Sequence, residues 1–215
     1  MHDNWYQSSA YFLSSFALIT TVDEKGVTSI GPYQLSFPFG VIQRREWIVI
    51  SRRGSNTSTN IKRIKKCAMN FVEYDKKQTK NIVDLGYPGQ EPEEKMKGCA
   101  FELEQSPSQE YRDDPDRPKI IKNAFQVFEC ELNDNPEDFY YKGTETTEYM
   151  LLKINKIHLK EKWRNNLDLG DDMKIPNMPI SFGFRNANQF WFAKHKKPFW
   201  LPTPEGKGAE HEAGM

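Results

Sequence analysis

The stretch WIVISRRGSNTSTNIKRIKK, residues 47–66, decides both the expected fold class and the main functional hypothesis. Its first four residues, WIVI, are β-branched or aromatic, and a serine follows. Because they do not alternate with polar residues, they predict a strand buried on both faces. Residues 57–60 (TSTN) are of the types that commonly cap helix N-termini. Ile61, Ile64 and Met69 lie on one side of the following segment, which predicts a short amphipathic helix with a basic opposite face.

The turn between this strand and this helix is a candidate anion site. Residues 44–66 contain eight basic residues and one acidic residue. A strand that leads directly into a helix presents free backbone N–H groups and the positive end of the helix dipole to an anion. Arg52 or Arg53 could grip two phosphate oxygens, and Gly54 allows a tight bend beside the ligand. The hydroxyl groups of Ser55, Thr57 and Thr59 could donate to the same group.

Two other interpretations of this segment remain open. It could be a well-capped surface helix with a solvated basic face, or a patch that binds nucleic acid. The aromatic residues are not interleaved with the basic ones, as a stacking surface for bases requires. Residues 84–116 show the opposite pattern, with ten acidic and three basic residues. This segment could be a solvated face, or it could pair with the basic segment of a second subunit.

The rest of the chain predicts mainly strands. Strands are expected at 17–22, 27–37 (two strands, broken near Gly31-Pro32), 68–74, 125–132, 149–159 and 180–193, and short helices at 76–85 and 91–97. Residues 23–26 are expected to form a turn with Gly26 at positive φ. Many strands with one short helix after the fourth predict a β-barrel. No G-x-G-x-x-G motif or alternating βαβ pattern is present, which makes a Rossmann domain improbable.

Composition limits the function classes. The chain has 215 residues with 30 Lys and Arg against 30 Asp and Glu, so bulk charge does not favour nucleic acid. Apolar runs are much shorter than the roughly 20 residues that span a bilayer, and residues 1–7 do not form a signal peptide. We therefore expect a cytoplasmic location without a membrane, one domain over residues 1–200, and a disordered tail at 201–215.

Standard catalytic patterns are missing from the sequence. The four histidines do not have metal-ligand spacing, and no nucleophile elbow is present. Cys67, Cys99 and Cys130 are widely spaced, which predicts reduced core thiols and no disulfide framework or zinc ribbon. The sequence thus gives no support for a hydrolase or a metalloenzyme.

Several segments together resemble the flavin reductase-like family of FMN-binding split barrels. They are ALITTVDEKG at 17–26, IGPY at 30–33, WIVIS at 47–51 and NTSTNI at 56–61, with later similarity at 86–88, 94–96 and 117–120. The resemblance covers roughly residues 15–160 and rests on the order and spacing of motifs that are individually weak. It implies a mainly β split barrel with a few short peripheral helices.

The resemblance also implies a cofactor and its contacts. It implies a homodimer with one FMN in each of two clefts at the interface, and NAD(P)H as a transient substrate. By position, Tyr33, Gln34, Leu35 and Ser36 would line the isoalloxazine, with their backbone groups on its pyrimidine edge. The phosphate would be held by Ser51, Arg52, Arg53, Ser55, Asn56 and Thr57, and Lys95 would approach the flavin from the partner side.

Four positions differ from the family pattern: Gln34-Leu35 replaces a Ser-Ser pair, Glu148 replaces a histidine, and Met96 replaces a phenylalanine. The implied function is an oxidoreductase that passes electrons from NAD(P)H through FMN to free flavin or another acceptor. A non-catalytic FMN-binding or redox-sensing protein and a nucleic-acid-binding barrel are the alternatives. The phosphate assignment predicts that Arg53→Ala or Thr57→Ala weakens FMN binding by about 1–3 kcal/mol.

Overall fold

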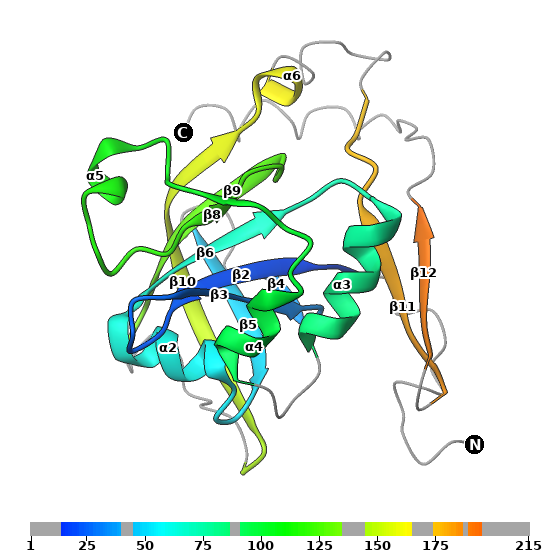
Figure 1. The fold of residues 1–215 in the computed structure, drawn as a ribbon, viewed down its shortest axis with the longest axis horizontal. Coiled ribbons are helices and arrows are strands. Elements are labelled where there is room, and N and C mark those ends of the chain that lie inside the picture. The colour runs from blue at the N-terminus through cyan, green and yellow to red at the C-terminus, as the bar shows by residue number, and fades with distance from the viewer. Residues whose placement is uncertain are drawn as a thin grey trace, which may run out of the picture.

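The computed structural model describes residues 14–39, 45–86, 91–134, 145–164, 174–186 and 189–194. The strands are β1 (Ser14–Ser15), β2 (Ala17–Val22), β3 (Thr28–Tyr33), β4 (Ser36–Phe39), β5 (Glu46–Arg52), β6 (Lys66–Phe71), β7 (Leu103–Glu104), β8 (Ile120–Ile121), β9 (Gln126–Leu132), β10 (Thr147–Leu159), β11 (Pro179–Asn186) and β12 (Gln189–Lys194). The helices are α2 (Asn56–Ile64), α3 (Lys76–Gly86), α4 (Pro92–Lys97), α5 (Gln109–Arg112) and α6 (Glu161–Arg164). The expected mainly β fold class is therefore confirmed (Figure 1).

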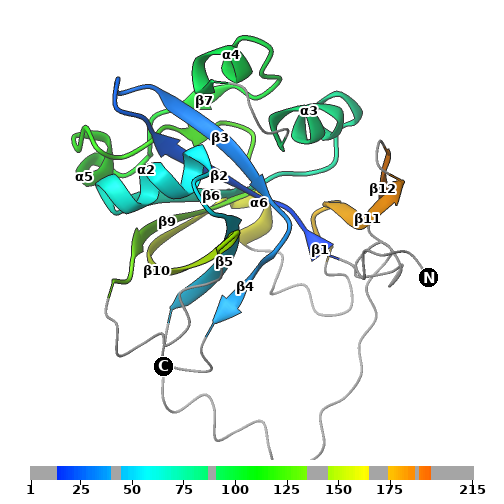
Figure 2. The same cartoon turned by 90° about the horizontal axis from the view of Figure 1, so that it is seen from below.

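The main sheet has seven antiparallel strands in the order β3-β2-β6-β9-β10-β5-β4. The long strand β10 pairs with β5 along its first half and with β9 along its second, and its register shifts between Ile154 and Lys156. Such a bulge increases local twist and bends the strand. The sheet curls so far that the Tyr33 hydroxyl on β3 lies 3.1 Å from Ser51 Oγ on β5. The sheet is thus a partly closed barrel (Figure 2).

Two apolar clusters lie on the two faces of this sheet. Alternate residues of one strand point to opposite faces, so Ala17 and Ile19 of β2 belong to one cluster and Leu18 to the other. The first cluster fills the barrel with Val49, Met69, Phe128 and Leu152, and α2 contributes Ile61 to it. The second packs the outer face against α3 through Ile82 and Leu85. This burial on both faces explains why β2 has no polar alternation.

Several expected elements are confirmed and others need correction. Strand β2 begins and ends as predicted, Gly26 has φ +77°, and helix α3 extends one residue beyond the prediction. The expected break at Gly31-Pro32 is wrong, because β3 continues to Tyr33 and the chain turns at residues 34–35. Pro32 is tolerated because β3 is an edge strand of its sheet.

The later segments also differ from expectation. The single strand expected at 180–193 is instead two strands, β11 and β12, and β11 pairs with both β1 and β12 in a separate three-stranded sheet. Met69 lies in β6, not in the preceding helix. Strand β5 is not buried on both faces, since Ile48 and Ile50 are half-buried while Val49 is fully buried. The expected tail, residues 201–215, lies outside the described residues.

Cys67 and Cys130 are buried free thiols opposite each other on β6 and β9, and Cys99 is a half-buried free thiol. Burial raises the pKa of the Cys130 thiol well above its ordinary value.

In the part of the chain that the structure describes, no helix combines the length and apolar character that a membrane crossing needs.

Candidate functional site

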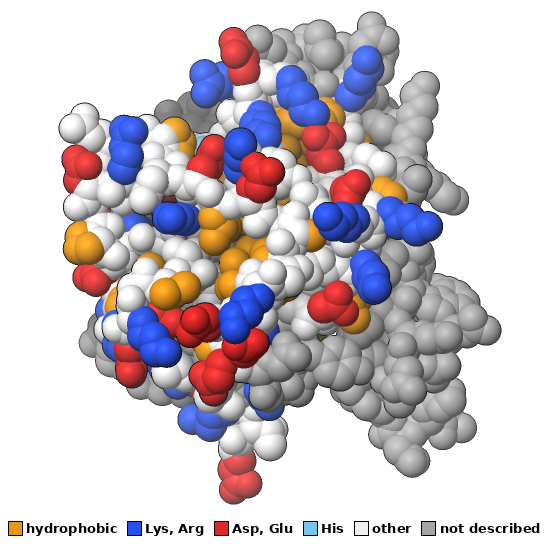
Figure 3. All heavy atoms as spheres, viewed as in Figure 1, with side chains coloured by type: hydrophobic (Ala, Val, Ile, Leu, Met, Phe, Trp, Pro, Cys, Tyr) orange, Lys and Arg blue, Asp and Glu red, His pale blue; other side chains and the backbone are white. Residues whose placement is uncertain are grey.

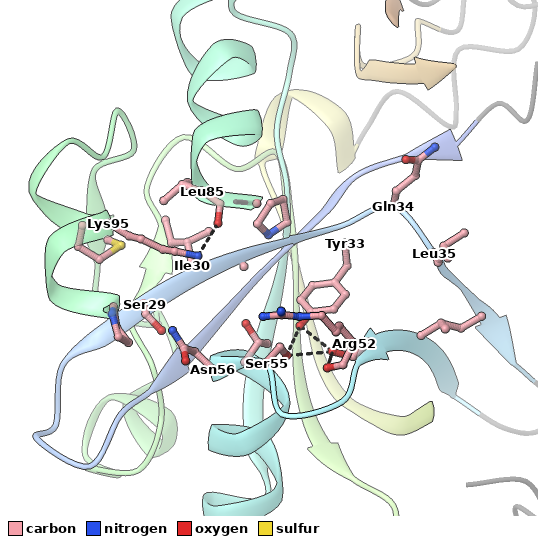
Figure 4. Close-up of a pocket in the computed structure, with 18 of the residues that line it drawn as sticks. Ser29, Ile30, Tyr33, Gln34, Leu35, Arg52, Ser55, Asn56, Leu85 and Lys95 are labelled. Carbon is pink, nitrogen blue, oxygen red and sulfur yellow. Dashed lines mark hydrogen bonds between the residues drawn. The ribbon is translucent and has the colours of Figure 1, made fainter. Parts of the chain in front are cut away.

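The site is a cavity of about 660 Å³ beside the first turn of α2, where β3 approaches the end of β5 (Figure 4). Helices α3 and α4 form its other wall. Its lining residues are Ser29, Ile30, Gly31, Pro32, Tyr33, Gln34, Leu35, Ile50, Ser51, Arg52, Ser55, Asn56, Thr57, Leu85, Gly86, Glu91, Pro92, Lys95 and Met96. Apolar walls with a few converging polar groups are typical of small-molecule sites.

The N-terminus of α2 provides the backbone donors of this cavity. Ser55 is the N-cap, two residues before the earliest cap expected from the sequence, and its Oγ accepts the Ser58 N–H at 3.1 Å. Thr59 N–H donates to the Ser55 carbonyl. Within the described residues, the N–H groups of Asn56 and Thr57 have no acceptor. These two donors and the positive end of the helix dipole can attract an anion.

Three hydroxyl groups meet at the same place. Tyr33 Oη lies 3.1 Å from both Ser51 Oγ and Ser55 Oγ, and the two serine oxygens are 2.9 Å apart. Ser51 is buried at the end of β5, and Tyr33 ends β3, so the cluster joins two strands and the helix cap (Figure 4). Each hydroxyl both donates and accepts, so the cluster can redirect a proton toward a bound oxyanion.

Close backbone packing fixes the first turn of α2. A Cβ atom built on Gly31 would lie 2.3 Å from Thr57 Oγ1, which is well inside van der Waals contact. Only glycine at this position of β3 lets the helix approach so closely. Gly54, in the turn before the cap, has φ +71°, a conformation that other residues rarely adopt.

The cavity has two basic side chains. Lys95 Nζ donates to the Leu85 carbonyl at 3.2 Å, and neither Lys95 nor Arg52 forms an ion pair with a carboxylate among the described residues. Burial, and then the positive charge of Arg52, lower the pKa of Lys95 from its ordinary value. An anion bound between the two side chains would relieve this repulsion, so their arrangement favours an anionic ligand.

The structure brings together most of the residues that the sequence predicts for the site. Nine of them line the cavity: Tyr33, Gln34, Leu35, Ser51, Arg52, Ser55, Asn56, Thr57 and Lys95. Ser36 and Arg53 are not among the lining residues. Lys95 reaches the cavity from the same chain that supplies Arg52, so no second subunit is needed to bring it there.

Part of the backbone expected at the flavin ring is already engaged within the chain. The Ser36 N–H donates to the Gln34 carbonyl at 3.0 Å, and the Leu35 carbonyl accepts the Ile50 N–H at 2.9 Å. The Arg53 N–H donates to the Thr146 carbonyl. Ring contacts from residues 33–36 are thus limited to the remaining backbone groups and the side chains.

The basic residues beyond the first turn of α2 interact with the chain itself. Lys62 Nζ lies 2.7 Å from Glu148 Oε2, and Arg63 donates to the Val22 carbonyl at 2.7 Å. The ammonium groups of Lys65 and Lys66 pair with Asp134 and Asp114, respectively. Acidic and basic side chains are also intermingled on the face shown in Figure 3. Asp114, one of the acidic residues of segment 84–116, therefore neutralises a lysine of its own chain.

Sequence reasoning missed several wall residues, among them Ser29, Ile30, Leu85 and Pro92. They lie on β3, α3 and α4, and of these four only Ile30 belongs to a motif quoted from the sequence, IGPY. Gly31 was noted as part of that motif and of a strand break and was not assigned to the site, although its missing side chain makes room for Thr57. A glycine inside a strand pattern is a signal of close backbone approach and could have indicated this contact.

Comparison with known proteins identifies the fold. No protein-family model matches the chain, and no curated protein sequence matches it. Among solved structures, 2-nitrobenzoate 2-nitroreductase from Pseudomonas fluorescens has TM-score 0.68 at 16% identity, over 90% of this chain and 86% of that one. Nitrilotriacetate monooxygenase component B from Bacillus cereus has TM-score 0.67 at 16% identity, over 93% of both chains.

A third similar structure is flavoredoxin from Methanosarcina acetivorans, with TM-score 0.65 at 12% identity, over 97% of this chain and 98% of that one. Another similar structure, from Shewanella frigidimarina, is described as a flavin reductase with a split barrel domain. The fold is the split barrel of flavin reductase-like proteins. The fold expected from the sequence resemblance is therefore confirmed, and at these identities the similarity shows the fold alone.

Proposed function

We propose that this split barrel binds FMN in the described cavity and is an oxidoreductase that passes electrons from NAD(P)H to free flavin or another acceptor. One observation carries the proposal: the free N–H groups of Asn56 and Thr57, the hydroxyl cluster and the Arg52 guanidinium meet in one cavity of about 660 Å³. The similar solved structures include a flavoredoxin and an FMN-binding protein from Thermus thermophilus, which supports flavin as the ligand class.

The residues present fit the phosphate end of FMN. A phosphate at the α2 N-terminus would accept the two free N–H groups and a hydroxyl proton from Ser51 or Ser55. Arg52 would donate two parallel hydrogen bonds from the rim. Lys95 would add a positive charge from the α4 side.

The ring end of the ligand would lie toward Tyr33, Gln34 and Leu35, where β3 turns into β4. FMN, when bound, would supply the redox chemistry between nicotinamide and acceptor. The chain orients the ring and excludes water from one of its faces. This chemistry needs aligned ring faces more than a general base, so the lack of a catalytic triad in the sequence is compatible with it.

We also propose a homodimer with the cavity near its interface, in the cytoplasm. Leu35 at the cavity rim is 42% exposed, and the neighbouring Ile48, Ile50, Phe37 and Phe39 on β4 and β5 are only half-buried. A second copy that covers this face would bury these side chains and complete the wall of the flavin cavity. The buried free thiols Cys67 and Cys130 suit a reducing compartment.

The nucleic-acid alternative has less support from the same segment. Four of its basic residues, Lys62, Arg63, Lys65 and Lys66, already interact with Glu148, the Val22 carbonyl, Asp134 and Asp114. Binding a phosphate backbone through these residues would require breaking those contacts.

A visible absorption spectrum of the purified protein tests the proposal, followed by release and identification of the chromophore. We expect a flavin spectrum, FMN on release, and bleaching by NADH or NADPH under anaerobic conditions. FMN without oxidation of either nicotinamide would reduce the proposal to a non-catalytic flavin-binding protein. Colourless protein that does not take up added FMN, and whose retention on DNA or RNA falls steeply with salt, would favour the nucleic-acid alternative.

A further inference from the structure

Glu148 lies directly behind the turn that forms the anion site. It is on β10, opposite Ser51 of β5, and its side chain is 7% exposed. Its Oε1 accepts the Gly54 N–H at 3.2 Å, and its Oε2 accepts from Lys62 Nζ at 2.7 Å. One carboxylate thus connects the turn before the helix cap to the exposed side of α2.

The bond to Gly54 determines which backbone donors face the cavity. Gly54 has φ +71°, and its N–H is used by Glu148, which does not line the cavity. Ser55 N–H donates to the Arg52 carbonyl, so the donors left at the cavity are those of Asn56 and Thr57. Without an acceptor at position 148, the Gly54 peptide would lose its partner, and the turn that carries Arg52 and Ser55 would lose an anchor.

The charge of Glu148 is compatible with a neighbouring anion. Burial raises the pKa of its carboxyl, but hydrogen bonds from Lys62, Ser58 and the Gly54 N–H, with the charge of Lys62, bring the pKa below its ordinary value. The carboxylate is therefore ionised at neutral pH, and Lys62 neutralises it at 2.7 Å. Arg52 and Lys95 bring two positive charges to the lining of the cavity, and Glu91 brings one negative charge.

We infer that Glu148 is a positioning residue for the flavin phosphate, and that it sets selectivity for FMN over the unphosphorylated riboflavin by holding the Gly54 turn. This inference rests on the proposed function, because it names what Glu148 does for that ligand. A positioning role differs from a purely structural one because its effect depends on the phosphate. If Glu148 only stabilised the fold, its loss would change the affinities for FMN and riboflavin equally.

The test compares FMN and riboflavin affinities, by fluorescence titration, of the wild type, Glu148→Ala and Glu148→Gln. Glu73→Gln is the matched control, because Glu73 also accepts from a lysine at 2.6 Å, that of Lys162, but does not line the cavity. For Glu148→Ala we expect about a tenfold loss of FMN affinity, typical of a lost hydrogen bond to a charged group, with riboflavin affinity changed less than about twofold. Glu148→Gln should recover most FMN affinity, because its amide oxygen can accept the Gly54 N–H.

A second measurement does not depend on flavin: amide hydrogen exchange of Gly54 in the ligand-free protein. We expect faster exchange in Glu148→Ala and near wild-type exchange in Glu148→Gln and Glu73→Gln. Unchanged FMN affinity in Glu148→Ala, or equal losses for FMN and riboflavin, would overturn the inference. Wild-type protein that binds neither flavin would instead contradict the proposed function, and the exchange data would then report separately whether Glu148 holds the turn.

Discussion

The two ends of helix α2 use similar residue types in opposite ways. At the N-terminus, two N–H groups, three clustered hydroxyls and the Arg52 guanidinium face a cavity. At the other end, Lys62, Lys65 and Lys66 pair with carboxylates of the same chain. In the sequence both ends carry basic residues, two before the helix and four at its other end. The difference teaches that the availability of a charge for a ligand depends on its partners in the fold, not on local composition.

The largest expected effect comes from closing the space between β3 and the N-terminus of α2. Gly31→Ala would place a Cβ 2.3 Å from Thr57 Oγ1 and push the first turn away from the cavity. We expect a loss of stability of about 1–3 kcal/mol, typical of overpacking, and a loss of FMN affinity of more than about tenfold. Chemical denaturation and flavin titration measure the two effects.

Gly98→Ala is the matched control for this substitution. A Cβ at Gly98 meets no atom within 4 Å, and its φ is −97°. Its stability and FMN affinity should stay close to those of the wild type. Equal behaviour of the two alanine variants would show that the close approach of Gly31 to Thr57 does not shape the site.

The next effect separates the two neighbouring arginines. Arg52→Ala should weaken FMN binding by about 1–3 kcal/mol, because Arg52 lines the cavity and its guanidinium can form charge-assisted hydrogen bonds. Arg53→Ala should have a much smaller effect, since Arg53 does not line the cavity. This revises the expectation from sequence, which placed both arginines at the phosphate and predicted this loss of affinity for Arg53→Ala. A larger effect at Arg53 in fluorescence titrations would contradict the arrangement of the turn.

Lys95→Met should change stability and binding in opposite directions. Burial and the charge of Arg52 lower the pKa of Lys95, so the folded state binds its proton less tightly than the unfolded state does. Stability therefore rises with pH between the lowered pKa and the ordinary one, and removing the charge should raise the melting temperature slightly at neutral pH. FMN affinity should fall about fivefold, as for a partly exposed charge pair.

The pH dependence of binding checks this assignment of Lys95. A bound anion favours the protonated lysine, so FMN affinity of the wild type should fall as pH rises through the pKa of Lys95. Lys95→Met should lack this alkaline decrease. If the alkaline decrease in FMN affinity persisted unchanged in Lys95→Met, another titrating group would be its cause.

The smallest effect is expected at the other end of the basic segment. Asp114→Asn removes the nearer of the two carboxylate partners of Lys66 and should cost at most about 1 kcal/mol of stability, with FMN affinity unchanged. Burial opposes ionisation of Asp114, but bonds from Lys66 and the Asp116 N–H bring its pKa below the ordinary value. Its contribution is therefore present at neutral pH and lost as pH falls through the lowered pKa. Acid denaturation curves of variant and wild type should converge at low pH.

The sequence predicted the elements that depend on local pattern. Strand β2 follows from a short run of apolar and β-branched residues, and helix α3 was expected at 76–85. The turn at Gly26 follows from its glycine. The break at Pro32 was predicted wrongly, because proline lowers strand propensity locally, whereas the edge position that tolerates it depends on the order of strands in the sheet.

The candidate site was predictable where the strand leads into the helix, and not where distant segments meet it. Ser51, Ser55 and Asn56 follow from the local sequence, although the cap itself was expected two residues later. Glu148 is 86 residues from Lys62 in the chain, so its role depends on the pairing of β5 with β10. The walls from α3 and α4 depend on tertiary packing in the same way.

The central claim is that the first turn of α2 holds the phosphate of FMN, and a crystal structure of the protein grown with FMN tests it most directly. We predict electron density for the phosphate within hydrogen-bond distance of the Asn56 and Thr57 N–H groups, with the ring toward Gln34 and Leu35. Flavin bound elsewhere on the chain, or a cavity that stays without flavin at saturating FMN, would contradict the claim.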